Sequence, residues 1–124
     1  MPGGNQFTIQ DVPIKASTVE TATGTMVDTP PSSETARAIE IWLDVTAASG
    51  TTPTLDVIVE TTIFDRDTGP YVQQAIFSGI TAVATQSLAL NRADNTLGKF
   101  IRIRWVIAGG SPSFTFLVRM GRME

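Results

Sequence analysis

The chain has 124 residues with a formal net charge of −3 and 42% hydrophobic residues, which are the size and composition of a single folded domain. It contains no cysteine and no histidine, which excludes cysteine nucleophiles, histidine bases, disulfides and the usual Cys/His zinc sites. We therefore expect a non-enzymatic protein with no catalytic residues, no cofactor and no metal, and the acidic balance disfavours nucleic acid as a partner.

The N-terminal segment, residues 1–10, reads MPGGNQFTIQ and is predicted to be an arm that is flexible or becomes ordered only against a partner. It lacks the charged and apolar stretches of a secretory signal, and no apolar run in the chain approaches the roughly 18 residues of a membrane span, so no membrane partner is expected. We hypothesise that the arm adds a strand to a neighbouring subunit, which makes Phe7 and Ile9 candidate interface residues. Deletion of residues 1–15 is then expected to abolish association while the core still folds.

Residues 11–124 are predicted to form one domain, because no repeat or linker divides them. Apolar and polar residues alternate with a period of two, most clearly at residues 39–45, which predicts strands and not helices. Pro13 places the first strand at a sheet edge, since proline cannot donate a ladder hydrogen bond. The fold class expected is all-β: a single antiparallel β-sandwich of the jelly-roll or immunoglobulin-like kind, with about 7–9 strands. The predicted strands are residues 7–19, 21–28, 35–47, 54–63, 71–78, a short run within 80–91, 100–107 and 113–120.

The last two predicted strands, residues 100–107 and 113–120, are expected to pair as a hairpin across the turn GGSP. In the register that puts their apolar side chains on one face, Trp105 lies opposite Phe116 and Arg102 lies opposite Arg119. This hairpin is predicted to be the centre of the core, with its arginines on the outer face. The apolar face consists of Ile101, Ile103, Trp105, Ile107, Phe114, Phe116, Val118 and Met120.

Arg102, Arg104 and Arg119 require an explanation, because like charges directly opposite each other destabilise a sheet. The first explanation is pairing with carboxylates of a neighbouring strand, such as Asp56 and Glu60 or Glu40 and Asp44. The second is contact with another protein subunit, which makes the three arginines candidate interface residues. Nucleic acid is a third and less favoured partner, since the chain is acidic overall.

Two acidic patterns each have a chemical and a structural interpretation. The sequence DRDTG, residues 65–69, resembles the start of a calcium loop, but Ile76 stands where the distant glutamate is required, so an ordinary turn is favoured. The carboxylates on the polar faces of the predicted strands resemble a glycosidase pair only in type, and solvated faces or cross-strand ion pairs are favoured. These carboxylates are Glu40, Asp44, Asp56 and Glu60.

Three stretches together resemble small β-sandwich structural proteins of tailed bacteriophage virions, in particular decoration or accessory head proteins: IEIWLDVTAASGTTPTLDVIVETT, FSGIT and LGKFIRIRWVIAGGSPSFTFLV. The resemblance covers roughly residues 36–118, and the loop DRDTGPY departs from the pattern. It implies a capsid decoration or cement protein, or another accessory head protein, that binds the capsid surface and stabilises the assembly. The implied partners are the major capsid protein, other virion subunits and further copies of the same chain. The implied location is the capsid exterior, after synthesis in the host cytoplasm.

Two other functions remain open from the sequence. One is a tail or head–tail joining component of the virion. The other is a carbohydrate-binding β-sandwich module, for which the candidate glycan contacts are Trp42, on the face opposite Ile41 and Leu43, and Tyr71, beside the loop of residues 65–70.

Overall fold

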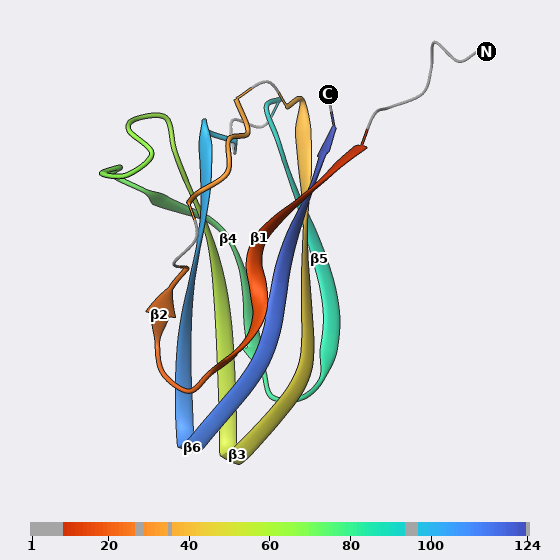
Figure 1. Ribbon diagram of the computed structural model, residues 1–124, viewed down its shortest axis with the longest axis vertical. Coiled ribbons are helices and arrows are strands. Elements are labelled where there is room, and N and C mark those ends of the chain that lie inside the picture. Colours follow the sequence, from red (N-terminus) through yellow and green to blue (C-terminus); the bar gives the residue numbers. More distant parts are fainter. Residues whose placement is uncertain (1–8, 27–28, 35, 94–96, 124) are drawn as a thin grey trace, which may run out of the picture.

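The computed structural model describes residues 9–26, 29–34, 36–93 and 97–123. These residues form an antiparallel all-β structure, which confirms the predicted fold class (Figure 1). Within the described ranges, no helix is long and apolar enough to cross a membrane. The strands are β1 (Ile9–Glu20), β2 (Gly24–Thr25), β3 (Ala38–Thr62), β4 (Val72–Ile80), β5 (Ala84–Asn91) and β6 (Phe100–Met123).

The two longest strands, β3 and β6, run antiparallel to each other over their whole length and bend together near their middles. Ala38 pairs with Met123 at one end of this ribbon, and Thr62 pairs with Phe100 at the other. Figure 1 shows the bends at the bottom of the molecule, where each strand turns back upward. The predicted strands at 35–47 and 54–63 are therefore two halves of one bent strand.

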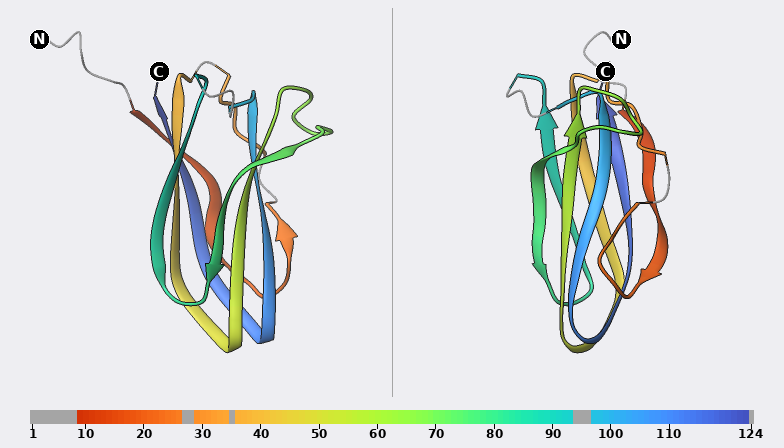
Figure 2. Two further views of the ribbon diagram at one scale, coloured as in Figure 1. Left: turned by 180° about the vertical axis from the view of Figure 1, so that it is seen from behind. Right: turned by 90° about the vertical axis from the view of Figure 1, so that its left-hand side faces the viewer.

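The bend divides the structure into two layers, which stand side by side in Figure 1. The first layer has the order β1, second half of β6, first half of β3, β5; the second has β2, first half of β6, second half of β3, β4. The right-hand view of Figure 2 shows β4 and β5 on the side of β3, and β1 on the opposite side, next to β6. If each half is counted separately, the four segments of each layer match a jelly roll and fall within the predicted strand number.

The bend itself is made by the two stretches that the sequence marks as turns, residues 49–53 and 109–112. Gly50 and Gly109 have φ values of 122° and 120°, which favour glycine. A Cβ atom on Gly50 would lie 2.9 Å from the carbonyl oxygen of Gly110, so the two corners pack backbone to backbone. Each stretch is thus a corner of the folded ribbon, and GGSP does not close a hairpin.

The predicted hairpin register is wrong, although the predicted faces are right. Trp105 pairs with Val57 and Phe116 pairs with Val45, so the two halves of β6 lie in different layers. Trp105 and Phe116 still meet, edge to face, with ring centroids 5.5 Å apart across the core. Alternation decides which face is buried, but two apolar faces can be joined either within one sheet or across two layers.

The core lies between the layers and is built from the alternating apolar residues of β3 and β6, with contributions from the other strands. Leu90 is buried as predicted, and Leu88 packs against the core from a partly buried position. The fully buried side chains of the two long strands include Ile39, Ile41, Leu43, Val45, Leu55, Val57, Val59, Ile101, Ile103, Phe114, Phe116, Val118 and Met120.

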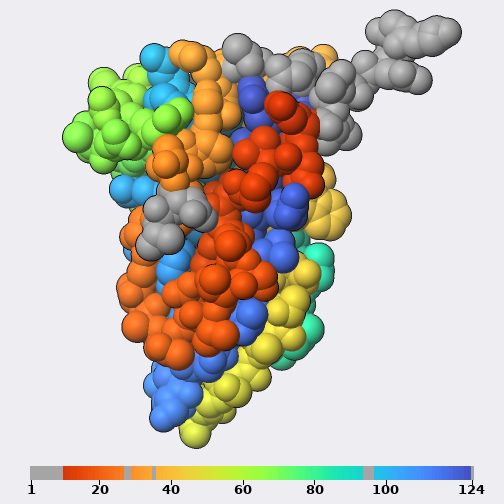
Figure 3. Space-filling view, in the orientation of Figure 1, coloured from red at the N-terminus to blue at the C-terminus, as the bar shows by residue number. Residues whose placement is uncertain are grey.

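The edge strand β1 pairs only with β6, as Pro13 predicts. It crosses the face of the molecule seen in Figure 3, over the blue surface of β6. The predicted arm lies mostly outside the described residues, and its last two residues, Ile9 and Gln10, begin β1. Because Ile14 is only 1% exposed, deletion of residues 1–15 would also remove part of the core.

Candidate interaction surfaces

The outer face of the first layer carries an exposed tryptophan between two polar side chains. Pro13, Arg119, Trp42 and Ser87 lie side by side across the four segments of the layer. Trp42 is 45% exposed, and its indole N–H donates a 2.5 Å hydrogen bond to Glu40 Oε1. The ring is therefore held in one orientation although it faces solvent, as its place in the strand alternation predicts.

A shallow hollow of about 430 Å³ opens beside the indole. Gly121 leaves space in the row next to Trp42, because it has no side chain. Asp44 stands on another side of the hollow and accepts a 3.0 Å hydrogen bond from the Thr85 hydroxyl. We call this feature the Trp42 hollow; it is lined by Asp11, Trp42, Asp44, Thr85, Leu117, Arg119, Met120 and Gly121.

Arg119 forms an exposed ion pair at the rim of the Trp42 hollow. Its Nε and Nη2 donate to the two carboxylate oxygens of Asp11 at 2.9 and 2.6 Å. This bidentate hydrogen bond, more than the charge itself, holds the pKa of Asp11 below its ordinary value, and it raises the pKa of Arg119. The pair fixes the guanidinium at the edge of the hollow.

The outer face of the second layer carries a more buried cluster, which we call the Glu60 cluster. Arg102 donates to Glu60 Oε1 from Nε at 2.9 Å and from Nη2 at 2.7 Å, and Arg104 Nε lies 3.4 Å from Glu60 Oε2. Glu60 is 6% exposed, and its neighbour on the same outer face, Ile58, is 5% exposed. One carboxylate thus answers two arginines, and the predicted cross-strand pairing is confirmed.

Tyr71 belongs to the Glu60 cluster and lies far from Trp42 in the fold. The Arg102 guanidinium lies 4.2 Å from the centroid of the Tyr71 ring, and the Tyr71 hydroxyl donates to the carbonyl of Arg66 at 2.7 Å. Partial burial raises the pKa of the Tyr71 phenol. The two candidate glycan contacts therefore lie on the outer faces of opposite layers and do not form one site.

The loop between β3 and β4 projects from the second layer, at the upper left of Figures 1 and 3. Asp65 Oδ1 accepts hydrogen bonds from the backbone N–H groups of Asp67 and Thr68, which lower the pKa of Asp65. The turn interpretation of DRDTG is thereby confirmed. Across the described residues, no group of three or more acidic side chains is placed to hold a metal ion.

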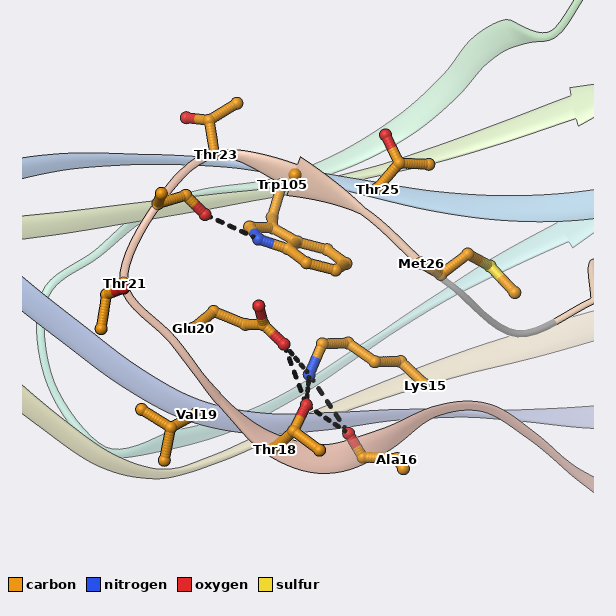
Figure 4. Close-up of a pocket in the computed structure, with 12 residues that line it drawn as sticks. Lys15, Ala16, Thr18, Val19, Glu20, Thr21, Thr23, Thr25, Met26 and Trp105 are labelled. Carbon is orange, nitrogen blue, oxygen red and sulfur yellow. Dashed lines mark hydrogen bonds and ion pairs between the residues drawn. The ribbon is translucent and has the colours of Figure 1, made fainter.

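Sequence reasoning missed Lys15, which points into the edge of the sandwich (Figure 4). Its ammonium donates to the carbonyl of Phe116 at 3.0 Å, lies 4.0 Å from the centroid of that ring and pairs with Glu20 at 3.3 Å. Alternation predicts an outward lysine next to the inward Ile14, but register shifts on both sides of Lys15 turn it inward. Because this ammonium is fully engaged, we interpret Lys15 as a structural contact between β1 and the core.

The predicted interface residues are not brought together on one surface. Arg102 and Arg104 lie on the second layer, and Arg119 lies on the first. The predicted opposition of Arg102 and Arg119 is wrong, because Arg102 lies opposite Glu60 and Arg119 lies opposite Trp42. Phe7 lies outside the described residues. Whether any of the arginines contacts another subunit stays a prediction.

Comparisons with known proteins show the fold. No protein-family model and no curated protein sequence matches this chain. Among solved structures, the chain is similar to one of infectious bursal disease virus, Gx strain, with a TM-score of 0.61 and 13% identity over 96% of this chain. It is similar to the VP2 subviral particle of infectious bursal disease virus with a TM-score of 0.60 and 12% identity, again over 96% of this chain. It is also similar to a chain in the structure of broad bean stain virus, with a TM-score of 0.51 and 8% identity over 100% of this chain.

The fraction of each solved chain that this chain covers differs among the three structures. This chain spans 32% and 33% of the two infectious bursal disease virus chains, and 88% of the broad bean stain virus chain. At these identities the likeness concerns the fold alone, which is an antiparallel β-sandwich of the jelly-roll kind.

Proposed function

We propose that this chain is a non-enzymatic structural subunit of a virus particle. The observation that carries the proposal is the likeness of 96% or more of the chain to jelly rolls found in virus structures. A jelly roll also suits this role physically, because its two outer faces and its corners are surfaces that neighbouring subunits can contact.

Within that role, we propose that the chain is a capsid decoration or accessory head protein of a tailed bacteriophage. The sequence resemblance over roughly residues 36–118 supports this assignment. The partners are the major capsid protein and further copies of the chain, and the location is the outer surface of the head. Such a subunit stabilises the shell by adding contacts between neighbouring capsid subunits.

The test is mass spectrometry and cryo-electron microscopy of purified virions that carry the gene for this chain. We expect the chain in many copies per particle, with jelly-roll density that follows the symmetry of the head surface. Density in the tail or at the head–tail joint would overturn the decoration assignment but keep the structural role. Absence of the chain from purified virions would overturn both.

We further propose that the N-terminal segment contributes to association. The deletion that tests this must spare the core, and β1 begins at Ile9 and carries the buried Ile14, so the deletion should end before Ile9. Deletion of residues 1–8 removes Phe7 and leaves the described part of β1 intact. We expect the truncated chain to keep its melting temperature and to lose binding to empty capsids in a co-sedimentation assay, and retained binding would contradict the proposal.

A further inference from the structure

The Trp42 hollow combines an exposed aromatic ring with polar groups that the fold holds in place. Trp42 is anchored through Glu40, and Arg119 is anchored through Asp11. Because these contacts exist within the chain itself, little ordering is left for a ligand to impose. Preorganised groups of this kind bind with a smaller entropic cost than mobile ones.

We propose that the Trp42 hollow binds neutral sugar units of a glycan. A pyranose ring has an apolar face of C–H groups and a rim of hydroxyls. The indole of Trp42 offers a flat apolar surface for the ring face, while Asp44 offers acceptor oxygens and Arg119 offers N–H donors for the rim. A hollow of about 430 Å³ lies within the ~300–1,000 Å³ range of small-molecule sites, which combine apolar walls with a few convergent polar groups.

The charge around the hollow selects against anionic ligands. Two carboxylates, those of Asp11 and Asp44, line the hollow together with one guanidinium, that of Arg119, and a third carboxylate, Glu40, is hydrogen-bonded to Trp42 beside it. A phosphate, a nucleic acid or an acidic sugar would meet like charge there, whereas a neutral hydroxyl can donate to a carboxylate and accept from the guanidinium. The proposed ligand is therefore a neutral glycan, and this proposal does not rest on the virion assignment.

The experiment uses the full chain and its tryptophan fluorescence. The chain has two tryptophans, of which Trp105 is 4% exposed and Trp42 is 45% exposed, so acrylamide quenching reports mainly on Trp42. Neutral oligosaccharides of glucose, galactose and mannose are screened on an array, and the best binder is titrated against the quenching signal. We expect saturable protection of Trp42 by at least one of these oligosaccharides.

Matched variants locate the binding. Trp42→Ala and Asp44→Asn should each lower the affinity at least about tenfold on the array and by calorimetry. Phe64→Ala removes an aromatic ring that is 58% exposed elsewhere on the surface, and it should leave the affinity unchanged. Circular dichroism and melting temperature check that each variant is folded.

Three results would overturn the proposal. The first is the absence of protection by every oligosaccharide in the set. The second is sugar binding that Trp42→Ala leaves unchanged. The third is protection of Trp42 by another partner while sugars have no effect. Protection by polylysine would make the hollow a contact for a basic protein. Self-association in light scattering that Trp42→Ala abolishes would make it a contact for a second copy of this chain.

Discussion

The two outer faces of the sandwich hold arginines in different ways. On the second layer, Glu60 is 6% exposed and serves both Arg102 and Arg104. On the first layer, Asp11 and Arg119 form a pair whose side chains are 64% and 46% exposed. Similar cross-strand ion pairs therefore join strands inside the sheet where they are buried, and remain accessible to solvent where they are exposed.

The largest loss of stability is expected from a substitution in the core, because the core supports both outer faces. Trp105 contacts Phe116 across the layers, and its indole N–H donates to the carbonyl of Ala22 at 3.0 Å. Trp105→Ala should lower the free energy of unfolding by about 3–5 kcal/mol, because it removes a large buried side chain and leaves a cavity. Urea denaturation measures this, and a loss below about 1 kcal/mol would show that Trp105 is not central to the core.

The next largest loss of stability is expected from a substitution of Glu60 in the Glu60 cluster of the second layer. Glu60→Gln keeps the shape of the side chain but leaves two arginines without a counter-charge, so we expect a loss of about 1–3 kcal/mol in urea denaturation. The matched control is Glu34→Gln, because Glu34 pairs with Lys99 at 3.5 Å on the exposed surface. If the two substitutions had equal effects, the burial of Glu60 would not explain its role.

A smaller effect separates the two arginines of the Glu60 cluster. Arg102 makes two contacts below 3.0 Å with Glu60 and stacks on Tyr71, whereas Arg104 makes one contact at 3.4 Å. Arg102→Ala should therefore cost about 1 kcal/mol more stability than Arg104→Ala. Arg102→Lys tests the geometry, since a lysine keeps the charge but cannot form the bidentate contact. Full retention of stability in Arg102→Lys would mean that charge alone matters.

The smallest effect is expected at the exposed pair and appears in titration more than in stability. The pKa of Asp11 is lowered from its ordinary value of 3.8, so the pair stabilises the folded chain above that value and loses this contribution as the pH falls through the lowered pKa. Carboxyl NMR should show the Asp11 pKa moving back toward 3.8 in Arg119→Gln. Asp65 is the internal control, because backbone N–H groups lower its pKa, and it should not move.

Much of the fold could be predicted from alternation because a period of two directly reports burial on a pleated strand. It correctly placed Ile41 and Leu43 in the core and Trp42 outside. Alternation could not identify the partner of each strand. The apolar face of residues 113–120 can meet that of residues 100–107 either within one sheet or across the core from another layer. The cross-layer arrangement was decided by the two corners at Gly50 and Gly109, which bend β3 and β6 together.

The candidate surfaces were predictable as residue types but not as sites. Trp42 and Arg119 are far apart in the chain and become neighbours only because β3 pairs with β6. Lys15 turns inward because of local register shifts that no pattern of single residues reveals.

For most strand positions, the sequence alone indicates which side chains face the core, which face solvent and where the chain can bend, because these depend on the chemistry of each residue and its nearest neighbours along the strand. The three-dimensional fold is needed to show which strands pair, that Arg102 lies against Glu60, and that Trp42, Asp44 and Arg119 line one hollow. The physical reason is that strand pairing depends on contacts between residues far apart in the chain, for which local alternation allows more than one solution.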